Sequence, residues 1–245
     1  YSMQRGGFQR NQERPLTCDL LIVDEASMIA TTLMHHLLKA VPSEATFILV
    51  GDVNQLPSVG AGNVLKDIID SGVAQVVELN EIFRQAQESS IIVNAHRINS
   101  GKLPIIETPD QPEQDFYFIE QEDPDEVLRI ILELAKERIP RRFGLEPLDD
   151  IQVLTPMHKG VVGAENLNAE LQEKLNPGNE GIARGGVQFR INDKVMQIRN
   201  NYDKEIFNGD IGTIKSIDSI NQEVMIVFDT GEISYDYFEL DEVVL

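Results

Sequence analysis

The sequence predicts an α/β protein, with a parallel, doubly wound sheet followed by a small antiparallel β-barrel. Short apolar runs at residues 19–23, 46–50 and 75–79 alternate with segments whose apolar residues recur at helical spacing. Strands that alternate with helices in this way are typical of a parallel sheet. After about residue 185 the pattern changes to several short strands of alternating polarity, which favours a barrel.

The elements before the barrel follow from apolar periodicity and from breaker residues. Leucines recur on one face of residues 31–41, and apolar residues on one face of residues 124–138, as amphipathic helices require. Gly101 and the prolines after it mark a boundary between the two halves. The predicted strands are 19–23, 46–50, 75–79, 115–120 and 150–155, and the predicted helices are 31–41, 63–71, 89–99, 124–138 and 162–175.

Turn residues separate the strands of the predicted barrel. Asn208-Gly209, the strongest short hairpin signal, and Thr230-Gly231 each lie between apolar runs. The predicted barrel strands are 194–199, 212–217, 223–228 and 232–235.

Polar side chains follow the first two predicted strands at the point where each strand ends. Asp24-Glu25 comes directly after residues 19–23, and Gly51-Asp52 with Gln55 comes after residues 46–50. Ligands of parallel sheets bind beyond the carboxyl ends of the strands. Two carboxylates at such an end can support a magnesium ion and polarise an attacking water, as nucleotide hydrolases require. The pattern therefore indicates an ATP-driven enzyme.

Bulk composition excludes several other classes of protein. The chain is 42% hydrophobic and 25% charged, as in ordinary globular proteins, and its apolar runs are too short to span a membrane. The single cysteine, Cys18, forms no internal disulfide and fits a reducing cytoplasm. A net charge of −20 argues against a broadly basic DNA-binding surface. A narrow, locally positive channel for single strands remains compatible with that charge.

In residue type and in order, these segments resemble the motifs of RecD-like DNA helicases of superfamily one. The alpha subunit of exodeoxyribonuclease V is a helicase of this type. The similarity covers most of residues 14–103 and 151–245. It implies RecA-like motor domains of the P-loop NTPase type with an SH3-like barrel inserted in the second. The matching segments are Asp24–Ser27 for motif II, Gly51–Gly60 for motif III, Glu78–Gln85 for motif IV, Asn94–Asn99 for the segment after it, and Leu154–Met157 and Asp193–Tyr202 for the second half.

The resemblance implies ATP and Mg²⁺ as cofactors and gives four residues a catalytic and cofactor-binding role. Asp24 would support the magnesium ion of ATP, Glu25 would activate water, and Gln55 would sense the γ-phosphate. Arg84 would stabilise charge on the transferring phosphoryl group, a task that suits a planar guanidinium. The alternatives are solvated strand ends for the carboxylates, a turn residue for Gln55 and a surface ion pair for Arg84.

The resemblance also implies single-stranded DNA as a partner. Thr155, Pro156 and Lys159 follow a predicted strand at a position that faces DNA in the family, where a hydroxyl, amides and a lysine can contact phosphates. Val59 and Asn63 belong to a Gly/Pro loop and its end, which we expect to touch the nucleic-acid backbone. A plain strand-exit loop and a plain helix-start loop are the respective alternatives.

The expected organisation has four parts. Residues 1–103 form the C-terminal part of the first motor domain, 104–150 an acidic connector, 151–184 the start of the second motor domain, and 185–245 the barrel. The chain has no G-x-x-x-x-G-K-[ST] loop and does not begin with methionine, and the family's last motifs do not follow. We therefore expect a piece of a longer protein that is inactive alone.

The expected full-length protein is a cytoplasmic helicase of DNA repair or recombination that works with other repair subunits. The resemblance alone implies its 5′ to 3′ polarity. Two alternatives stay open, namely the helicase portion of a conjugative relaxase and a non-hydrolysing interaction module.

Overall fold

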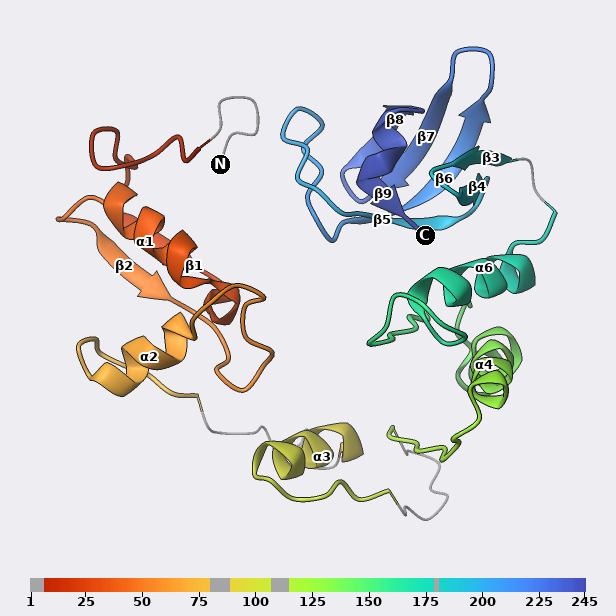
Figure 1. Ribbon diagram of the computed structural model, residues 1–245, viewed down its shortest axis with the longest axis horizontal. Helices are drawn as coiled ribbons and strands as arrows, with labels where there is room; N and C mark the ends of the chain where they lie inside the picture. Colours follow the sequence, from red (N-terminus) through yellow and green to blue (C-terminus); the bar gives the residue numbers. More distant parts are fainter. Residues whose placement is uncertain (1–6, 80–88, 107–114, 179–180) are drawn as a thin grey trace. The chain divides into compact units, whose positions relative to one another are not determined.

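The computed structural model describes residues 7–79, 89–106, 115–178 and 181–245. The chain forms two compact units, Tyr1–Phe118 and Ile119–Leu245 (Figure 1). The unit boundary falls inside the segment 104–150 that the sequence marks as a connector.

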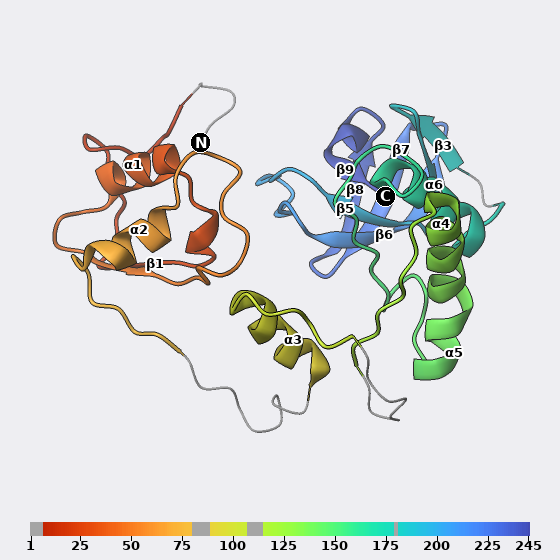
Figure 2. The same ribbon diagram turned by 60° about the horizontal axis from the view of Figure 1, so that its bottom comes forward.

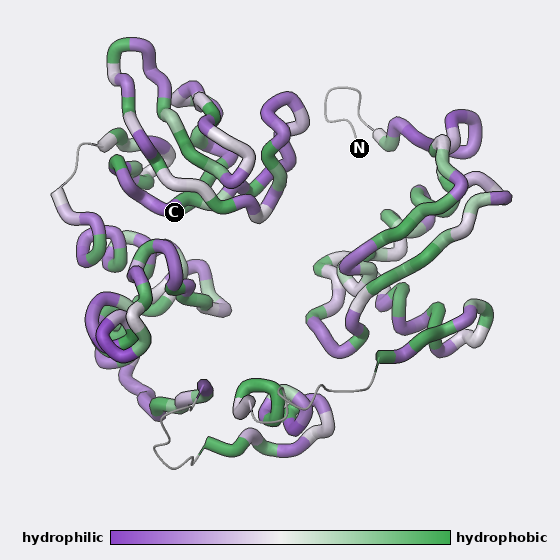
Figure 3. Tube along the Cα trace, turned by 180° about the vertical axis from the view of Figure 1, so that it is seen from behind, coloured by the Kyte–Doolittle hydropathy of each residue, from purple (hydrophilic) through white to green (hydrophobic). Residues whose placement is uncertain are grey.

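The first unit is built around a parallel pair of strands, β1 and β2. The register pairs Leu20 with Thr46 and Val23 with Leu49, and Figure 3 shows both strands as hydrophobic segments. The elements are β1 (Leu20–Val23), a 3₁₀ turn η1 (Ala26–Met28), α1 (Thr31–Ala40), β2 (Thr46–Leu49), α2 (Val64–Ser71) and α3 (Ser90–Asn99). These bounds confirm the predicted strands and helices up to residue 71 and the predicted helix 89–99.

One face of this strand pair carries the core of the first unit. Met34 of α1 and Leu65 of α2 are buried against it, together with Ala26 and Ile29. Both helices therefore cover the same face, whereas the side chain of Ile22 on the other face is 56% exposed. The predicted doubly wound arrangement, with helices on both faces, is not seen within the described residues.

Three predicted strands do not form. Residues 75–79, 115–120 and 150–155 adopt no strand, and within the described residues they pair with no other strand. A strand needs a neighbouring backbone to satisfy its N–H and C=O groups. Leu79 is 93% exposed and Leu154 87% exposed, so the apolar composition that suggested buried strands does not place these side chains in a core.

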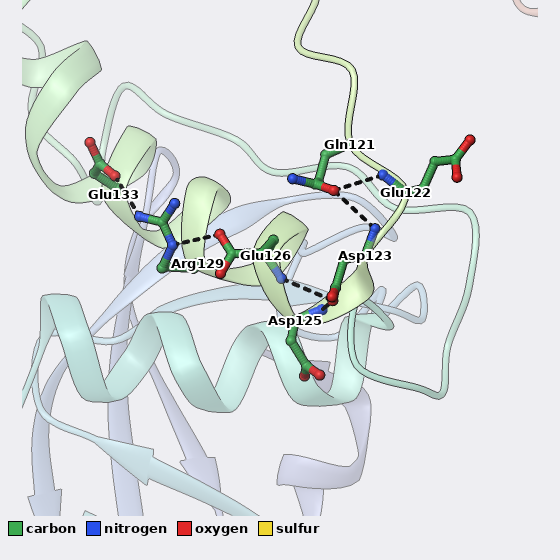
Figure 4. Close-up of polar contacts among 7 residues, drawn as sticks. All are labelled: Gln121, Glu122, Asp123, Asp125, Glu126, Arg129 and Glu133. Carbon is green, nitrogen blue, oxygen red and sulfur yellow. Dashed lines mark hydrogen bonds and ion pairs between the residues drawn. The ribbon is translucent and has the colours of Figure 1, made fainter.

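The predicted helix 124–138 forms and continues further, as α4 (Pro124–Glu133), a π-helical turn (Leu134–Arg138) and α5 (Ile139–Phe143). Asp123 caps its start by accepting hydrogen bonds from the N–H groups of Asp125 and Glu126 at 2.9 and 3.4 Å (Figure 4). Pro140 has no N–H to donate to the preceding turn, and the π turn ends two residues before it, at Arg138. Gly144 ends the helix with a φ of 69°.

The second unit also contains α6 (Ala164–Leu175) and the barrel, whose sheet has the antiparallel order β8-β7-β6-β5-β9. Its core includes Phe189, Ile214, Ile226 and Tyr235, all 2% exposed or less. The predicted barrel strands are confirmed. The bounds are β3 (Gly181–Arg184), β4 (Val187–Arg190), β5 (Lys194–Gln197), β6 (Ile211–Asp218), β7 (Glu223–Phe228), β8 (Gly231–Asp236) and β9 (Val243–Val244).

A buried polar chain crosses the barrel core. The Tyr235 hydroxyl donates to Gln197 Oε1 at 3.0 Å, and Gln197 Nε2 donates to Glu242 Oε2 at 3.2 Å. Burial is the main cause that raises the pKa of Tyr235 to about 12, with nearby carboxylates adding to it. The phenol therefore stays neutral and remains a hydrogen-bond donor, which satisfies the buried amide of Gln197.

Asp193 joins the barrel to α6. Its carboxylate is buried and accepts from Asn176 Nδ2 at 2.7 Å, from Gln172 Nε2 at 2.6 Å and from the Arg190 N–H at 2.6 Å. Burial raises the pKa of Asp193, and these hydrogen bonds oppose the rise. The Asp193 side chain thus holds the end of α6 against the end of β4, the strand that precedes Asp193.

We predict that Asp193→Asn lowers the free energy of unfolding of the second unit by about 1–3 kcal/mol, because an amide nitrogen would face donors where an acceptor is needed. Asp229→Asn is the matched control, since Asp229 is exposed in the turn between β7 and β8. Urea unfolding followed by circular dichroism measures both variants. Equal unfolding midpoints for the two variants would contradict the role of Asp193.

Candidate functional site

The polar ends of β1 and β2 are joined by two backbone hydrogen bonds. The Val50 N–H donates to the Val23 carbonyl at 2.8 Å, and the Ala26 N–H donates to the Val50 carbonyl at 2.9 Å. Asp24 and Glu25 lie between these two bonds. The chain after β1 therefore crosses directly over the end of β2, and both carboxylates are held at that edge of the sheet.

Glu25 adopts a left-handed backbone conformation, with φ 52° and ψ 38°. This region costs a residue with a side chain roughly 1–2 kcal/mol. The Asp24 carboxylate accepts the Glu25 N–H at 2.8 Å, which helps to fix the turn. Backbone strain of this kind concentrates at functional sites, and here it occurs at one of the predicted catalytic carboxylates.

Gly51 allows the second polar segment to lie against the first. A Cβ atom at this position would lie 3.1 Å from the backbone nitrogens of Ala26 and Ser27 and 2.9 Å from Leu65 Cδ2. A side chain would therefore push the two strand ends apart. The structure brings Asp24-Glu25 and Gly51-Asp52 together at one edge, as the parallel pairing of their strands requires.

The segment after Gly51 turns tightly and presents Gln55 to solvent. The Asp52 carboxylate accepts the Asn54 N–H at 2.9 Å, and the Gln55 N–H donates to the Asp52 carbonyl at 3.2 Å. The side chain of Gln55 is exposed and makes no hydrogen bond with any residue that the structure describes. It is thus available for a ligand at the strand edge.

Sequence reasoning missed the arrangement of Ser27. This residue is 4% exposed, and its hydroxyl has no hydrogen-bond partner among the described residues. A buried unpaired hydroxyl costs about 1–3 kcal/mol. The sequence motif includes Ser27. No feature of the sequence, however, predicts the left-handed turn at Glu25 that buries the Ser27 side chain.

The loop at residues 57–62 is fastened to the start of α1. Thr31 donates to the Ala61 carbonyl from both its N–H and its Oγ1, each at 3.0 Å. A Cβ at Gly62 would overlap Thr31 Oγ1, so the loop depends on glycine at its contact with α1. Val59 is fully exposed and Asn63 is half-buried before α2, so Val59 projects from an anchored loop.

The predicted DNA-contacting residues of the second unit lie in a loop folded onto the start of α6. Thr155 Oγ1 donates to the Val162 carbonyl at 2.7 Å, so its hydroxyl proton is engaged inside the loop. The Ala164 N–H donates to the Met157 carbonyl at 2.9 Å. Pro156 and Lys159 are exposed, and they remain available to a ligand.

The remaining observations concern the predicted catalytic residue Arg84, metal ions and membranes. Arg84 lies outside the described residues, so the structure gives it no position. Among the residues that are described, no group of three or more His, Cys, Asp or Glu side chains converges to hold a metal ion. Asp24 and Asp52 nevertheless offer carboxylate oxygens, the ligands that Mg²⁺ prefers.

None of the described helices is long and apolar enough to cross a bilayer.

Comparisons with known proteins match both units. The SH3 domain of ATP-dependent RecD-like DNA helicases matches residues 167–228, and an AAA domain matches residues 6–114. The ATP-dependent RecD2 DNA helicase of Deinococcus radiodurans is 38% identical over 208 residues, covering 85% of this chain and 27% of that protein. The RecBCD enzyme subunit RecD of Mycolicibacterium smegmatis is 28% identical over 215 residues, covering 84% of this chain and 38% of that protein.

A solved structure shares the fold. The Pif1 helicase from Bacteroides, crystallised with ADP-AlF3 and single-stranded DNA, superimposes with a TM-score of 0.50 at 18% identity, covering 96% of this chain and 55% of that chain. The present chain spans between about a quarter and two fifths of the RecD2 and RecD relatives. By its similarity to the RecD2 and RecD proteins and to the SH3 domain of RecD-like helicases, the chain belongs to the RecD-like helicase family.

Proposed function

We propose that the full-length protein is an ATP-dependent DNA helicase that couples ATP hydrolysis to translocation on single-stranded DNA and to duplex unwinding. The observation that carries this proposal is the joining of Asp24-Glu25 to Gly51-Asp52 through the Ala26–Val50 hydrogen bond of 2.9 Å. The named activity of the RecD2 relative, an ATP-dependent DNA helicase, supports it.

In this proposal, ATP and Mg²⁺ bind at the polar ends of β1 and β2. Asp24 holds the magnesium ion of ATP and Glu25 accepts a proton from the attacking water. Gln55, exposed after its turn, contacts the γ-phosphate. Arg84 supplies positive charge to the transferring phosphoryl group.

Single-stranded DNA is the proposed partner of both units. Lys159 and Pro156 offer exposed contacts beside α6, and Thr155 offers the acceptor side of its hydroxyl, since its proton is already engaged. In the first unit, the exposed Val59 and the neighbouring Asn63 would touch the strand. We further propose 5′ to 3′ movement, a cytoplasmic role in repair or recombination with other repair subunits, and the domain limits 1–103, 104–150, 151–184 and 185–245.

We predict that Glu25→Gln in the full-length protein lowers steady-state ATP hydrolysis by about 10²–10⁴-fold, because glutamine keeps the size but takes no proton from water. ATP binding, measured by isothermal titration calorimetry, should stay within a few-fold of the parent protein. Glu44→Gln is the control, an exposed glutamate of the same unit. Turnover near that of the parent protein would remove Glu25 from the proposed role.

We also predict that the 245 residues fold but hydrolyse no ATP by themselves, with or without single-stranded DNA. They contain no Gly-rich loop with a lysine to hold the β- and γ-phosphates. A cooperative thermal melt together with phosphate release at the blank level is the expected result. Turnover stimulated by single-stranded DNA would show that the phosphates bind elsewhere in the chain.

A further inference from the structure

Two segments of the first unit, residues 25–31 and residues 50–62, are joined at both ends. At one end the backbone bond from Ala26 ties the turn after β1 to the end of β2. At the other end Thr31 donates two hydrogen bonds to the Ala61 carbonyl, one from its N–H and one from its Oγ1, each at 3.0 Å. This pair of bonds is called here the threonine clamp. It closes the two segments into a ring, and Figure 2 shows the loop leading into α2 that forms one side of the ring.

The hydroxyl bond of the threonine clamp does more than cap α1. The N–H groups of the first helical turn have no partner inside the helix, so the N–H bond of Thr31 satisfies an ordinary need of α1. The Oγ1 bond serves no such need, because it brings a second donor to the same carbonyl. A Cβ atom on Gly62 would overlap Thr31 Oγ1, so the loop lies closely against this side chain. The hydroxyl therefore fixes the loop rather than the helix.

The connection from the clamp to Glu25 is short and stiff. Within η1 the Met28 N–H donates to the Glu25 carbonyl at 3.0 Å. A Cβ atom on Gly60 would lie 2.6 Å from Ala30 Cβ, so the loop also packs against the residue that precedes Thr31. Because only one 3₁₀ turn separates the clamp from Glu25, a displacement of the loop is carried to that carboxylate.

The loop itself is braced. Ser58 Oγ donates to the Gly60 carbonyl at 3.0 Å and also lies 3.4 Å from the Gly62 carbonyl oxygen. Val59, between Ser58 and Gly60, is fully exposed. A ligand that contacts Val59 therefore pushes a braced loop, and the displacement reaches the clamp instead of being absorbed within the loop.

One buried group in the ring lacks a partner in this arrangement. The Ser27 hydroxyl is 4% exposed and has no hydrogen-bond partner among the described residues. Such groups are rare in folded proteins and call for a specific explanation. A second arrangement of the ring, in which Ser27 gains a partner, supplies one. Coupling between two sites is carried by elements that have two such arrangements.

We propose that Thr31 is a positioning residue that makes ATP hydrolysis respond to single-stranded DNA. DNA that contacts Val59 displaces Ala61, and the threonine clamp transmits this displacement through η1 to Glu25. This inference rests on the proposed helicase function and adds regulation of the same site to it. In this role Thr31 acts through other residues and contacts neither the nucleotide nor the DNA.

The test compares three variants of the full-length protein. Thr31→Val keeps the shape of the side chain and the backbone bond but removes the hydroxyl bond, whereas Thr31→Ser keeps the hydroxyl. Thr32→Val is the matched control, because Thr32 is exposed in the same turn of α1 and its side chain forms no hydrogen bond with any described residue. Steady-state ATP hydrolysis is measured for each variant over a series of oligo(dT) concentrations that begins at zero.

We expect Thr31→Val to lower the kcat reached at saturating oligo(dT) by about fivefold, the effect of losing one hydrogen bond of typical net strength. Its turnover without DNA and its KM for ATP should match those of the unmodified protein, because the clamp lies outside the nucleotide contacts. Thr31→Ser and Thr32→Val should match the unmodified protein in all three quantities.

Hydrogen exchange of the Ala26 amide provides a readout other than activity. Saturating oligo(dT) should slow this exchange in the unmodified protein and in Thr31→Ser, because the clamp carries the contact at Val59 to the other end of the ring. In Thr31→Val, oligo(dT) should leave the exchange of this amide unchanged.

Three results would overturn the proposal, namely unchanged DNA stimulation in Thr31→Val, an equal loss of turnover with and without DNA, and an equal loss in Thr32→Val. The second result would make the clamp a structural contact only. The absence of DNA stimulation in the unmodified protein would reject the helicase function and this inference together. Stimulation that survives in Thr31→Val would reject the inference alone, so the two failures are distinguishable.

Discussion

The hydrogen bond from the Ala26 N–H to the Val50 carbonyl, at 2.9 Å, fixes the arrangement on which the candidate site depends. It ties the segment after β1 to the end of β2, so the two polar segments cannot separate without breaking it. Gly51 makes the bond possible, because a Cβ there would approach the nitrogens of Ala26 and Ser27 to 3.1 Å. The same crossing turns Glu25 into its left-handed conformation and buries Ser27.

The two units are stabilised in different ways. The first has a small core, with Met34 and Leu65 buried beside the strand ends, and it also contains the buried Ser27 hydroxyl, which has no hydrogen-bond partner among the described residues. The barrel has a larger apolar core, and the buried polar side chains of Gln197 and Asp193 form hydrogen bonds with their neighbours. Low local stability is common where ligands bind, so the contrast agrees with a site in the first unit.

Local patterns in the sequence were enough to predict elements that depend on local contacts. Alternation predicted β7 at 223–228, and helical period predicted α6, because their apolar faces pack within their own unit. The prediction of a strand at residues 75–79 is wrong, since a strand also requires a partner strand that its own residues do not reveal. The motifs indicated Asp24 and Glu25, but the left-handed turn, the burial of Ser27 and the contact of Gly51 arise from tertiary packing and were not predicted.

Amide hydrogen exchange at Ala26 tests the central claim most directly, because that N–H forms the bond that joins the two strand ends. The amide should be protected in the unmodified chain, and Gly51→Ala should accelerate its exchange at least about tenfold, corresponding to ~1.4 kcal/mol of local opening. Barrel amides such as that of Ile226 should exchange as before, since they belong to the other unit. Unchanged protection of Ala26 in Gly51→Ala would contradict the account.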